Sequence, residues 1–320
     1  MEDSGEVEEE MNDVVFGLIY SSISLATPIL LVSIIELIVE KGGVLNLSIE
    51  GSMLIGAFSA FMVAYYTDNL IYASITAAFS GLLLCLLFAF LTIALALDQM
   101  VTGIALNLLA LGVTSYLYRA SFGWYVSPIP PHIEKTIATL EIPVLSKIPL
   151  IGELLFNHIP HTYIAFIMVF ICWFLFKTDL GLKIRAIGED PEIAEALGIN
   201  VNVLRYILLL VEGAIAGISG SLLSIAYYNM FLDNMTSGRG YVAIALIILA
   251  RWNPLLLLPA VYFFNFVDVL QLRIQASGLA WFPYQFSLML PYLFTILALF
   301  IMGRRVRGPS SLAKPYKKLR

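Results

Sequence analysis

Residues 177–205 read Lys-Thr-Asp-Leu-Gly-Leu-Lys-Ile-Arg-Ala-Ile-Gly-Glu-Asp-Pro-Glu-Ile-Ala-Glu-Ala-Leu-Gly-Ile-Asn-Val-Asn-Val-Leu-Arg, a polar stretch in an otherwise apolar chain. Inside it, both ends of a short helix are marked. Asp190 is expected to cap the helix, and Pro191 suits its first position because the missing N–H has no helical partner there. Gly198 supplies the C-terminal stop. The pattern predicts a helix of about two turns between two membrane segments.

One face of this predicted helix is small and apolar. Ile193, Ala196 and Leu197 recur at the three- and four-residue spacing of a single helical face, with Ala194 at its margin. Such a face between acidic flanks suits insertion into a groove on another protein, although an ordinary surface helix would carry the same caps. On the docking interpretation, Ala194→Arg or Leu197→Glu is expected to abolish the contact. The predicted docking residues are Glu189, Asp190, Pro191, Glu192, Ile193, Ala194, Glu195, Ala196, Leu197 and Gly198.

The composition places the rest of the chain in a membrane. Hydrophobic residues make up 60% of the 320 residues and charged residues 13%, with a mean hydropathy of +0.88. A water-soluble globule of this length cannot have that composition. The expected fold is therefore all-α, a polytopic bundle of about 8–10 spans. Nine apolar segments are predicted, at about 14–39, 44–66, 70–97, 101–118, 162–176, 204–227, 241–250, 255–272 and 288–302.

Charge divides the chain into a membrane domain at 14–302 and two tails. Residues 1–13 are acidic, contain no Lys or Arg and do not resemble a signal peptide, so we expect a solvated, disordered leader. Residues 303–320 are basic, and basic residues also flank the 177–205 stretch. The positive-inside rule places both of these regions in the cytoplasm.

The proline-rich segment 120–161 is then an outer loop, and it contains all three histidines, His132, His158 and His161. We expect these histidines to be solvated, because no further metal ligands accompany them. Cys85 and Cys172 lie in apolar runs and predict neither a disulfide nor a metal site.

Two polar, glycine-containing breaks interrupt the membrane pattern, at residues 42–51 and 234–245. Polar backbone at membrane depth persists only where protein or a water-filled cavity covers it, so both breaks indicate a path for a solute. On the predicted topology they enter from opposite sides, as inverted repeats would. Other polar residues in the spans, Glu36, Glu212, Asn265 and Asp268, fit either a path or hydrogen bonding between helices. The candidate path residues are Asn46, Ser48, Glu50, Asn107, Thr236 and Arg239.

Several sequence motifs for other activities are absent. There is no Gly-x-x-x-x-Gly-Lys-Ser/Thr phosphate loop, so the chain itself is not expected to bind ATP in that manner. A His-Glu-x-x-His helix and a Gly-x-Ser-x-Gly elbow are also missing from the sequence, which disfavours an intramembrane protease or esterase. We therefore expect no catalytic residues and no bound metal.

Motifs in four separated regions resemble those of the permease subunits of ABC importers for nucleosides and simple sugars, within the branched-chain amino acid and ribose permease superfamily. They are residues 43–58, residues 103–110, residues 181–201 and residues 235–243. The similarity covers most of 14–302, and the four regions occur in the family's order. Arg251 departs from the pattern, because a small residue or glycine is expected there.

The resemblance implies a heteromeric importer in a prokaryotic plasma membrane. Its other parts would be a second, similar permease, an ATPase subunit that binds ATP-Mg, and an extracellular lipid-anchored binding protein. The helix at 190–198 would dock on the ATPase, and the permease would work by alternating access. An ion-coupled secondary transporter remains an alternative because of Glu50, Glu212 and the broken helices. A membrane enzyme or scaffold is a third, without a supporting motif.

Overall fold

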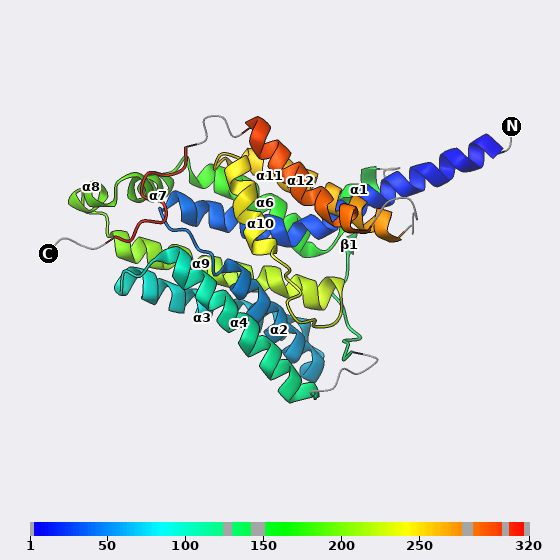
Figure 1. The fold of residues 1–320 in the computed structure, drawn as a ribbon, viewed down its shortest axis with the longest axis horizontal. Helices are drawn as coiled ribbons and strands as arrows, with labels where there is room; N and C mark the ends of the chain where they lie inside the picture. The colour runs from blue at the N-terminus through cyan, green and yellow to red at the C-terminus, as the bar shows by residue number, and fades with distance from the viewer. Residues whose placement is uncertain (1–2, 124–129, 142–150, 277–283, 303–306, 317–320) are drawn as a thin grey trace.

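The computed structural model describes residues 3–123, 130–141, 151–276, 284–302 and 307–316. Helices dominate this part of the chain (Figure 1). In chain order the elements are α1 (Asp3–Lys41), α2 (Ile49–Thr67), α3 (Leu70–Ala89), the π-helical turn η1 (Phe90–Ala94), α4 (Gln99–Phe122), β1 (Leu140–Glu141), α5 (Ile151–Phe156), β2 (Asn157–His158), α6 (Pro160–Leu175), α7 (Asp179–Glu189), α8 (Pro191–Ala196), α9 (Val201–Leu222), the π-helical turn η3 (Leu223–Tyr227), α10 (Arg239–Leu249), α11 (Pro254–Ala276) and α12 (Tyr284–Met302).

The predicted class, a polytopic helical bundle, is confirmed. Among the described residues, six helices are long and apolar enough to cross a membrane, and the pair α6 and α7, bent by 77°, makes a seventh if counted as one span. Each of the nine predicted segments overlaps one of the helices. However, α10 has only 11 residues, so it rises about 17 Å and cannot cross alone.

Helix α1 is the centre of the bundle. Its residues 26–40 are buried on every side, as expected for a helix that is hydrophobic all round, and α6, α9, α10 and α11 pack against it. The helix begins at Asp3. The described acidic residues therefore extend the first membrane helix, and the predicted disordered leader is wrong for residues 3–13.

Helix α9 lies against α2 and α3 at very short range because glycines line the contact. A methyl group on Gly220 would overlap the carbonyl oxygen of Met53 in α2, and one on Gly217 would overlap that of Ala77 in α3. Small residues permit this approach in membranes, where packing and backbone contacts replace the hydrophobic effect as the driving force. Gly213, Gly217 and Gly220 thus set the distance between α9 and its neighbours α2 and α3.

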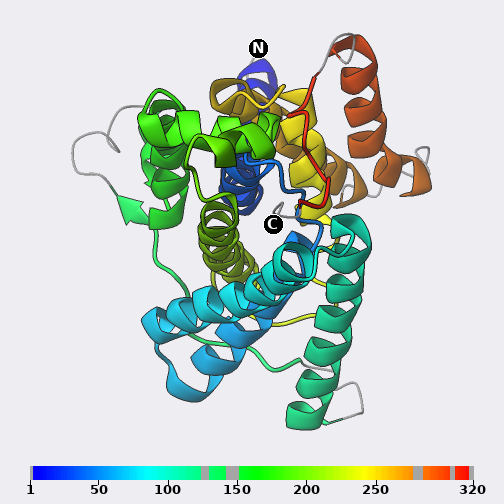
Figure 2. The ribbon, with the colours of Figure 1, turned by 90° about the vertical axis from the view of Figure 1, so that its left-hand side faces the viewer.

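The two ends of the molecule carry different parts of the chain. The helices α7 and α8 and the C-terminal segment lie at one end of the long axis, and the start of α1 lies at the other (Figure 1). Figure 2 views the molecule from the α8 end and shows α4 and α12 as outer helices. Beside the middle of α1, β1 and β2 form a two-residue antiparallel pair with Leu140 opposite His158. The predicted outer loop at 120–161 thus contains α5 and this short β-pair among its described residues.

Candidate functional site

The first polar break is held together by Asn46. Its side-chain oxygen accepts hydrogen bonds from the backbone N–H of Ser48 at 3.0 Å and from the Ser48 hydroxyl at 2.5 Å. Its backbone N–H donates to Glu36 Oε1 at 3.2 Å, and Nδ2 donates to Cys85 Sγ at 3.3 Å. Both Asn46 and Ser48 are completely buried. These two predicted path residues therefore satisfy each other and the backbone between α1 and α2.

The second polar break meets the first at Glu50. One carboxylate oxygen of Glu50 accepts the backbone N–H of Gly238 and the other accepts that of Gly240, both at 2.7 Å. These donors lie at the start of α10, where backbone N–H groups lack helical partners and the helix dipole favours a negative charge. Gly238 has a φ of +83°, a conformation that favours glycine. The side chain of Glu50 thus joins α2 to α10.

Asn107 in α4 completes this junction. Its Oδ1 accepts the backbone N–H of Gly51 at 2.7 Å, and its Nδ2 donates to the carbonyl oxygen of Leu47 at 2.7 Å and to the hydroxyl of Tyr241 at 2.5 Å. The amide therefore contacts the start of α2 and the start of α10 together. We call the arrangement of Glu50 and Asn107 between the two helix starts the central junction.

A polar cavity of about 170 Å³ opens beside the junction, between α1, α10, α11 and α12. Arg239 lines it, and its Nη1 also donates to the carbonyl oxygens of Met235 and Thr236 at 3.2 and 3.3 Å. Thr236 is fully buried, and its hydroxyl has no hydrogen-bond partner among the described residues. The other polar side chains of the cavity are Ser237, Asp268 and Gln271. Of the predicted path residues, Arg239 is the one that faces this cavity.

Three buried carboxyl groups lie near the end of α1 that is closest to α8. Glu36, Glu40 and Glu212 are each at most 1% exposed. Glu40 Oε2 accepts the indole N–H of Trp252 at 2.5 Å, while both oxygens of Glu212 lack a partner among the described residues. The sequence singled out Glu36 and Glu212 but missed Glu40. The four-residue spacing of Glu36 and Glu40, which puts them on one helical face, was the available signal.

The predicted helix in the polar stretch is confirmed as α8. Asp190 accepts the backbone N–H groups of Glu192 and Ile193 at 3.1 and 3.0 Å, and Gly198 follows the helix with a φ of +87°. Ile193 and Leu197 are 60% and 77% exposed. These caps hold an apolar pair on the surface.

Ala194 points the other way. It is 1% exposed and packs with Ile187 of α7 and Val201 of α9. An arginine at this position would also disrupt the packing of α8 on its own chain, so Ala194→Arg does not test docking separately from that packing. The sequence also did not identify α7, whose Thr178 cap accepts the N–H of Gly181.

The C-terminal segment 307–316 fastens the α7 and α8 region to the membrane helices. The Ser311 hydroxyl donates to the carbonyl oxygen of Gly188 at 2.6 Å, and the Tyr316 hydroxyl donates to Glu195 of α8. Arg205 is 3% exposed and donates to the carbonyl oxygens of Gly42 at 3.1 Å and Ile187 at 3.4 Å. This arginine connects the start of α9 to the first polar break and to α7. We call 307–316 the C-terminal strap.

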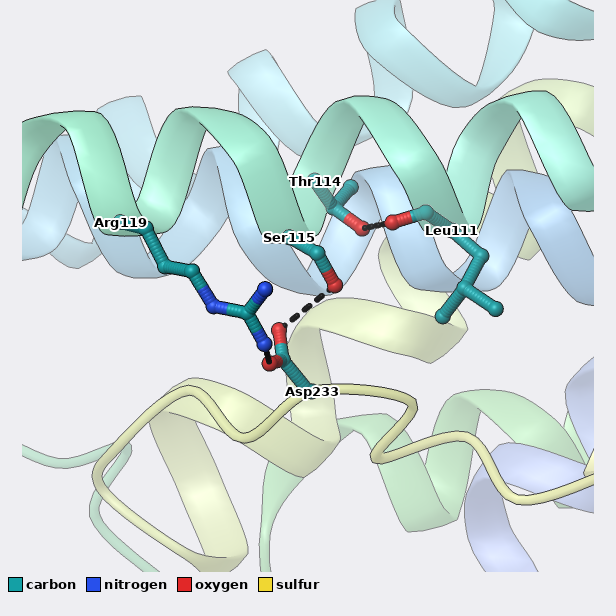
Figure 3. A network of polar contacts seen from close by, with 5 residues as sticks. All are labelled: Leu111, Thr114, Ser115, Arg119 and Asp233. Atoms are coloured by element: carbon teal, nitrogen blue, oxygen red, sulfur yellow. Dashed lines mark hydrogen bonds and ion pairs between the residues drawn. The ribbon is translucent and has the colours of Figure 1, made fainter. Parts of the chain in front are cut away.

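At the opposite end, an ion pair links α4 to the segment before α10 (Figure 3). Arg119 donates to Asp233 at 2.8 Å, and Ser115 donates to the other carboxylate oxygen at 2.8 Å. The Arg119 and Asp233 side chains are 47% and 39% exposed. Helix α4 also contacts α10 at the central junction, through Asn107 and Tyr241. The ion pair is therefore a second, solvent-accessible connection between α4 and this part of the chain.

The expectation of solvated histidines is wrong for His158, which is 1% exposed. Its Nε2 contacts the carbonyl oxygen of Leu154 at 2.8 Å, its Nδ1 contacts the Ser24 hydroxyl at 3.1 Å, and its ring stacks on Tyr20 with centroids 4.6 Å apart. Burial lowers the pKa of His158 below its ordinary value. His158 therefore fastens the outer segment to α1. No group of His, Cys, Asp and Glu that could hold a metal exists among the described residues.

Over residues 18–301, the chain matches the family described as branched-chain amino acid transport system / permease component, and it belongs to that family. It is thus a permease subunit of an ABC transporter, a multi-span component of the plasma membrane.

Relatives with assigned names support this class. The chain is 37% identical to the putative glucose ABC transporter permease protein TsgC13 of Haloferax volcanii, over 83% of this chain and 80% of that protein. It is 35% identical to the guanosine ABC transporter permease protein NupQ of Bacillus subtilis, over 92% and 94%, and 31% identical to the nucleoside ABC transporter permease protein NupC of Lactococcus lactis, over 94% and 95%. No solved structure matches the chain.

These similarities decide between the functional alternatives. The relatives are named as permease proteins of ABC transporters, which makes this chain a transport component and not an enzyme. They support the ABC importer permease over the ion-coupled carrier. ATP is hydrolysed by a separate subunit in such transporters, so the energy must reach this chain through a protein contact.

Proposed function

We propose that this permease imports a nucleoside or a simple sugar by alternating access, driven by an ATPase subunit that binds ATP-Mg and docks on α8. The observation that carries the proposal is the exposed apolar pair Ile193 and Leu197 on a helix whose ends are capped and whose inner face is packed. Apolar side chains exposed on such a rigid support are typical of a docking surface. The solute class follows the relatives, whose names specify guanosine, nucleosides and glucose.

The path in this proposal passes the central junction. Glu50 and Asn107 join the starts of two interrupted helices, and such helix starts are where transporters place their solute sites. Movement of α8 on ATP binding would be transmitted through Arg205 to the backbone at Gly42. The connection between the two breaks would then open on one side or the other, a shift between two global states.

The proposed assembly contains a second, similar permease and an extracellular solute-binding lipoprotein. The proposed orientation places α8, the coupling residues at 177–205 and the basic C-terminal tail in the cytoplasm. Cysteine labelling tests this orientation, because Cys85 and Cys172 are buried and give little background. An impermeant maleimide should label Asp233→Cys in intact cells and Lys314→Cys only after permeabilisation. The reverse pattern would refute the orientation.

Docking is tested with Leu197→Glu in the co-expressed transporter. A carboxylate forced into an apolar socket should abolish co-purification with the ATPase and ATP-dependent uptake, because its burial there is costly. Leu140→Glu is the matched control, since Leu140 is also exposed, at 49%, but lies in β1 near the opposite end. Normal co-purification of Leu197→Glu would exclude the docking role. The solute class is tested separately by thermal shifts of the cognate binding protein with nucleosides and sugars.

A further inference from the structure

The cavity beside the central junction contains two oppositely charged groups that attract each other without direct contact. Arg239 and Asp268 both line it and interact electrostatically, but among the described residues no ion pair within contact distance joins them and Asp268 accepts no hydrogen bond. Ionisable side chains within membrane helices are costly and normally pair with protein or serve a solute. A carboxylate that lines a cavity and accepts no hydrogen bond from the described residues has acceptor positions open to a solute.

The remaining lining gives this cavity a defined chemistry. Arg239 uses only Nη1 for its backbone contacts, and a guanidinium carries five N–H donors in all. Gln271 adds both a donor and an acceptor, and Ser237 adds a hydroxyl. Ile29, Val242 and Phe264 form apolar walls. Acceptors and donors set among apolar walls match a ring that presents several hydroxyl groups.

The volume of this cavity, and the apolar lining of the larger one, limit which ligand the permease can bind and where. At about 170 Å³, the cavity is smaller than the roughly 300–1,000 Å³ typical of pockets for drug-sized ligands, so it admits one ring and not a whole nucleoside. A larger cavity of about 480 Å³ between α1, α5, α6 and α11 is lined almost entirely by apolar side chains. A sugar would lose its hydrogen bonds to water there without replacement.

We propose that the cavity between α1, α10, α11 and α12 binds the sugar ring of the transported solute, with Asp268 accepting from ring hydroxyls and Arg239 and Gln271 donating to ring oxygens. This inference rests on the proposed function and specifies which part of the solute the permease itself recognises. The shared chemistry is a ring with neighbouring hydroxyls, whether it arrives as a free sugar or as part of a nucleoside. Asp268 and Gln271 thereby become specificity-determining residues next to the central junction.

The test uses the complete transporter in liposomes, with the binding protein saturated in turn with a nucleoside, its 2′,3′-dideoxy analogue and free ribose. Loading is verified separately for each solute, so that differences in uptake report the permease. In Asp268→Asn, ATP-dependent uptake of the two hydroxylated solutes should fall about tenfold or more, the effect of losing hydrogen bonds to a charged group. Uptake of the dideoxy analogue should change by less than about threefold. The ratio between solutes is therefore the decisive measurement.

Asp233→Asn is the matched control, because it removes a carboxylate that lies outside the cavity and pairs with Arg119. It should leave the ratio unchanged. Gln271→Leu is the second variant, and it should lower uptake of the hydroxylated solutes selectively even if Asp268→Asn fails to assemble with the ATPase. Equal losses for all three solutes, or no loss in either cavity variant, would overturn the proposal. A wild-type transporter that shows no ATP-dependent uptake of any solute would instead refute the proposed function.

Discussion

The carboxylate of Glu50 accepts the backbone N–H of Gly240 at 2.7 Å, across 190 residues of sequence. Its other oxygen accepts the N–H of Gly238 at the same distance. One side chain thus compensates two unpaired donors at the start of α10 and holds it against α2. Each polar break is stable because the other break supplies the hydrogen-bond partners that its polar groups need.

Replacement of Glu50 by Gln should destabilise this junction. The amide retains one acceptor oxygen but turns its NH₂ group toward a backbone donor, and the charge that favours the helix start is lost. We expect a loss of about 1.5–3 kcal/mol, the range for hydrogen bonds to charged groups, and a marked loss of uptake. Thermal unfolding of the purified transporter measures the first effect. Glu134→Gln, at an exposed acid, is the control. Equal melting temperatures for the two variants would contradict the role of Glu50 in joining α2 to α10.

Substitution of Gly220 by Ala should loosen the contact between α9 and α2. The added methyl group would overlap the carbonyl oxygen of Met53, and the helices must separate at a cost of about 1–3 kcal/mol. Gly112→Ala in α4 is a matched control, because no atom lies within 4 Å of the added carbon and alanine is the better helix former. Comparison of the two melting temperatures tests the packing. An unchanged melting temperature for Gly220→Ala would disprove it.

Removal of the Tyr316 hydroxyl should release α8 from the C-terminal strap. Burial, together with the neighbouring Glu195 carboxylate, raises the pKa of Tyr316 to about 12, so at neutral pH the phenol stays protonated and donates a hydrogen bond to Glu195. Tyr316→Phe lacks this donor. We expect several-fold faster hydrogen exchange of the amides at 192–198, consistent with the loss of a hydrogen bond to a charged group. Tyr66→Phe, at a tyrosine that is 66% exposed near the other end, should leave hydrogen exchange of the amides at 192–198 unchanged.

Mild acid should weaken the attachment of the outer segment to α1. Because the pKa of His158 is lowered by burial, the unfolded segment binds more protons than the folded one as the pH falls below the ordinary value of about 6.5. The contribution of His158 to stability is complete above that pH and is lost below it. The protection factors of the amides at 154–158, which correct for the intrinsic pH dependence of exchange, should therefore fall between pH 7.5 and 5.5. His158→Gln should flatten this pH dependence, whereas His132→Gln, at an exposed histidine, should preserve it.

Local sequence patterns predicted the elements more reliably than their roles. The apolar segments and the caps of α8 were identified because hydropathy, Asp190 and Gly198 act over a few residues. The inward position of Ala194 was missed, because α7 and α9 cover a side of α8 that the spacing alone leaves unassigned. The helical residues 3–13 were also missed, since acidic composition indicates solvation but does not exclude a helix that continues a membrane span.

For the candidate path residues, the sequence likewise predicted where the polar groups lie but not which groups they contact. Their polarity at membrane depth marked both breaks correctly, because a polar group in a span always needs a partner. The sequence could not distinguish Asn46, which is satisfied within its own break, from Glu50 and Asn107, which join separate helices. It also ranked Asp268 among the secondary candidates, because its position opposite Arg239 arises only when α10 and α11 pack together.

The sequence by itself determined that the chain is a multi-span helical membrane protein with a capped helix between two spans, because composition, periodicity and capping are properties of neighbouring residues. Only the tertiary structure decided which polar groups meet. Glu50 reaches α10, Glu40 reaches Trp252, and Arg205 reaches Gly42, each across more than 160 residues of sequence. Those pairings depend on how α1, α2, α9 and α10 pack against one another, and no local pattern specifies that packing.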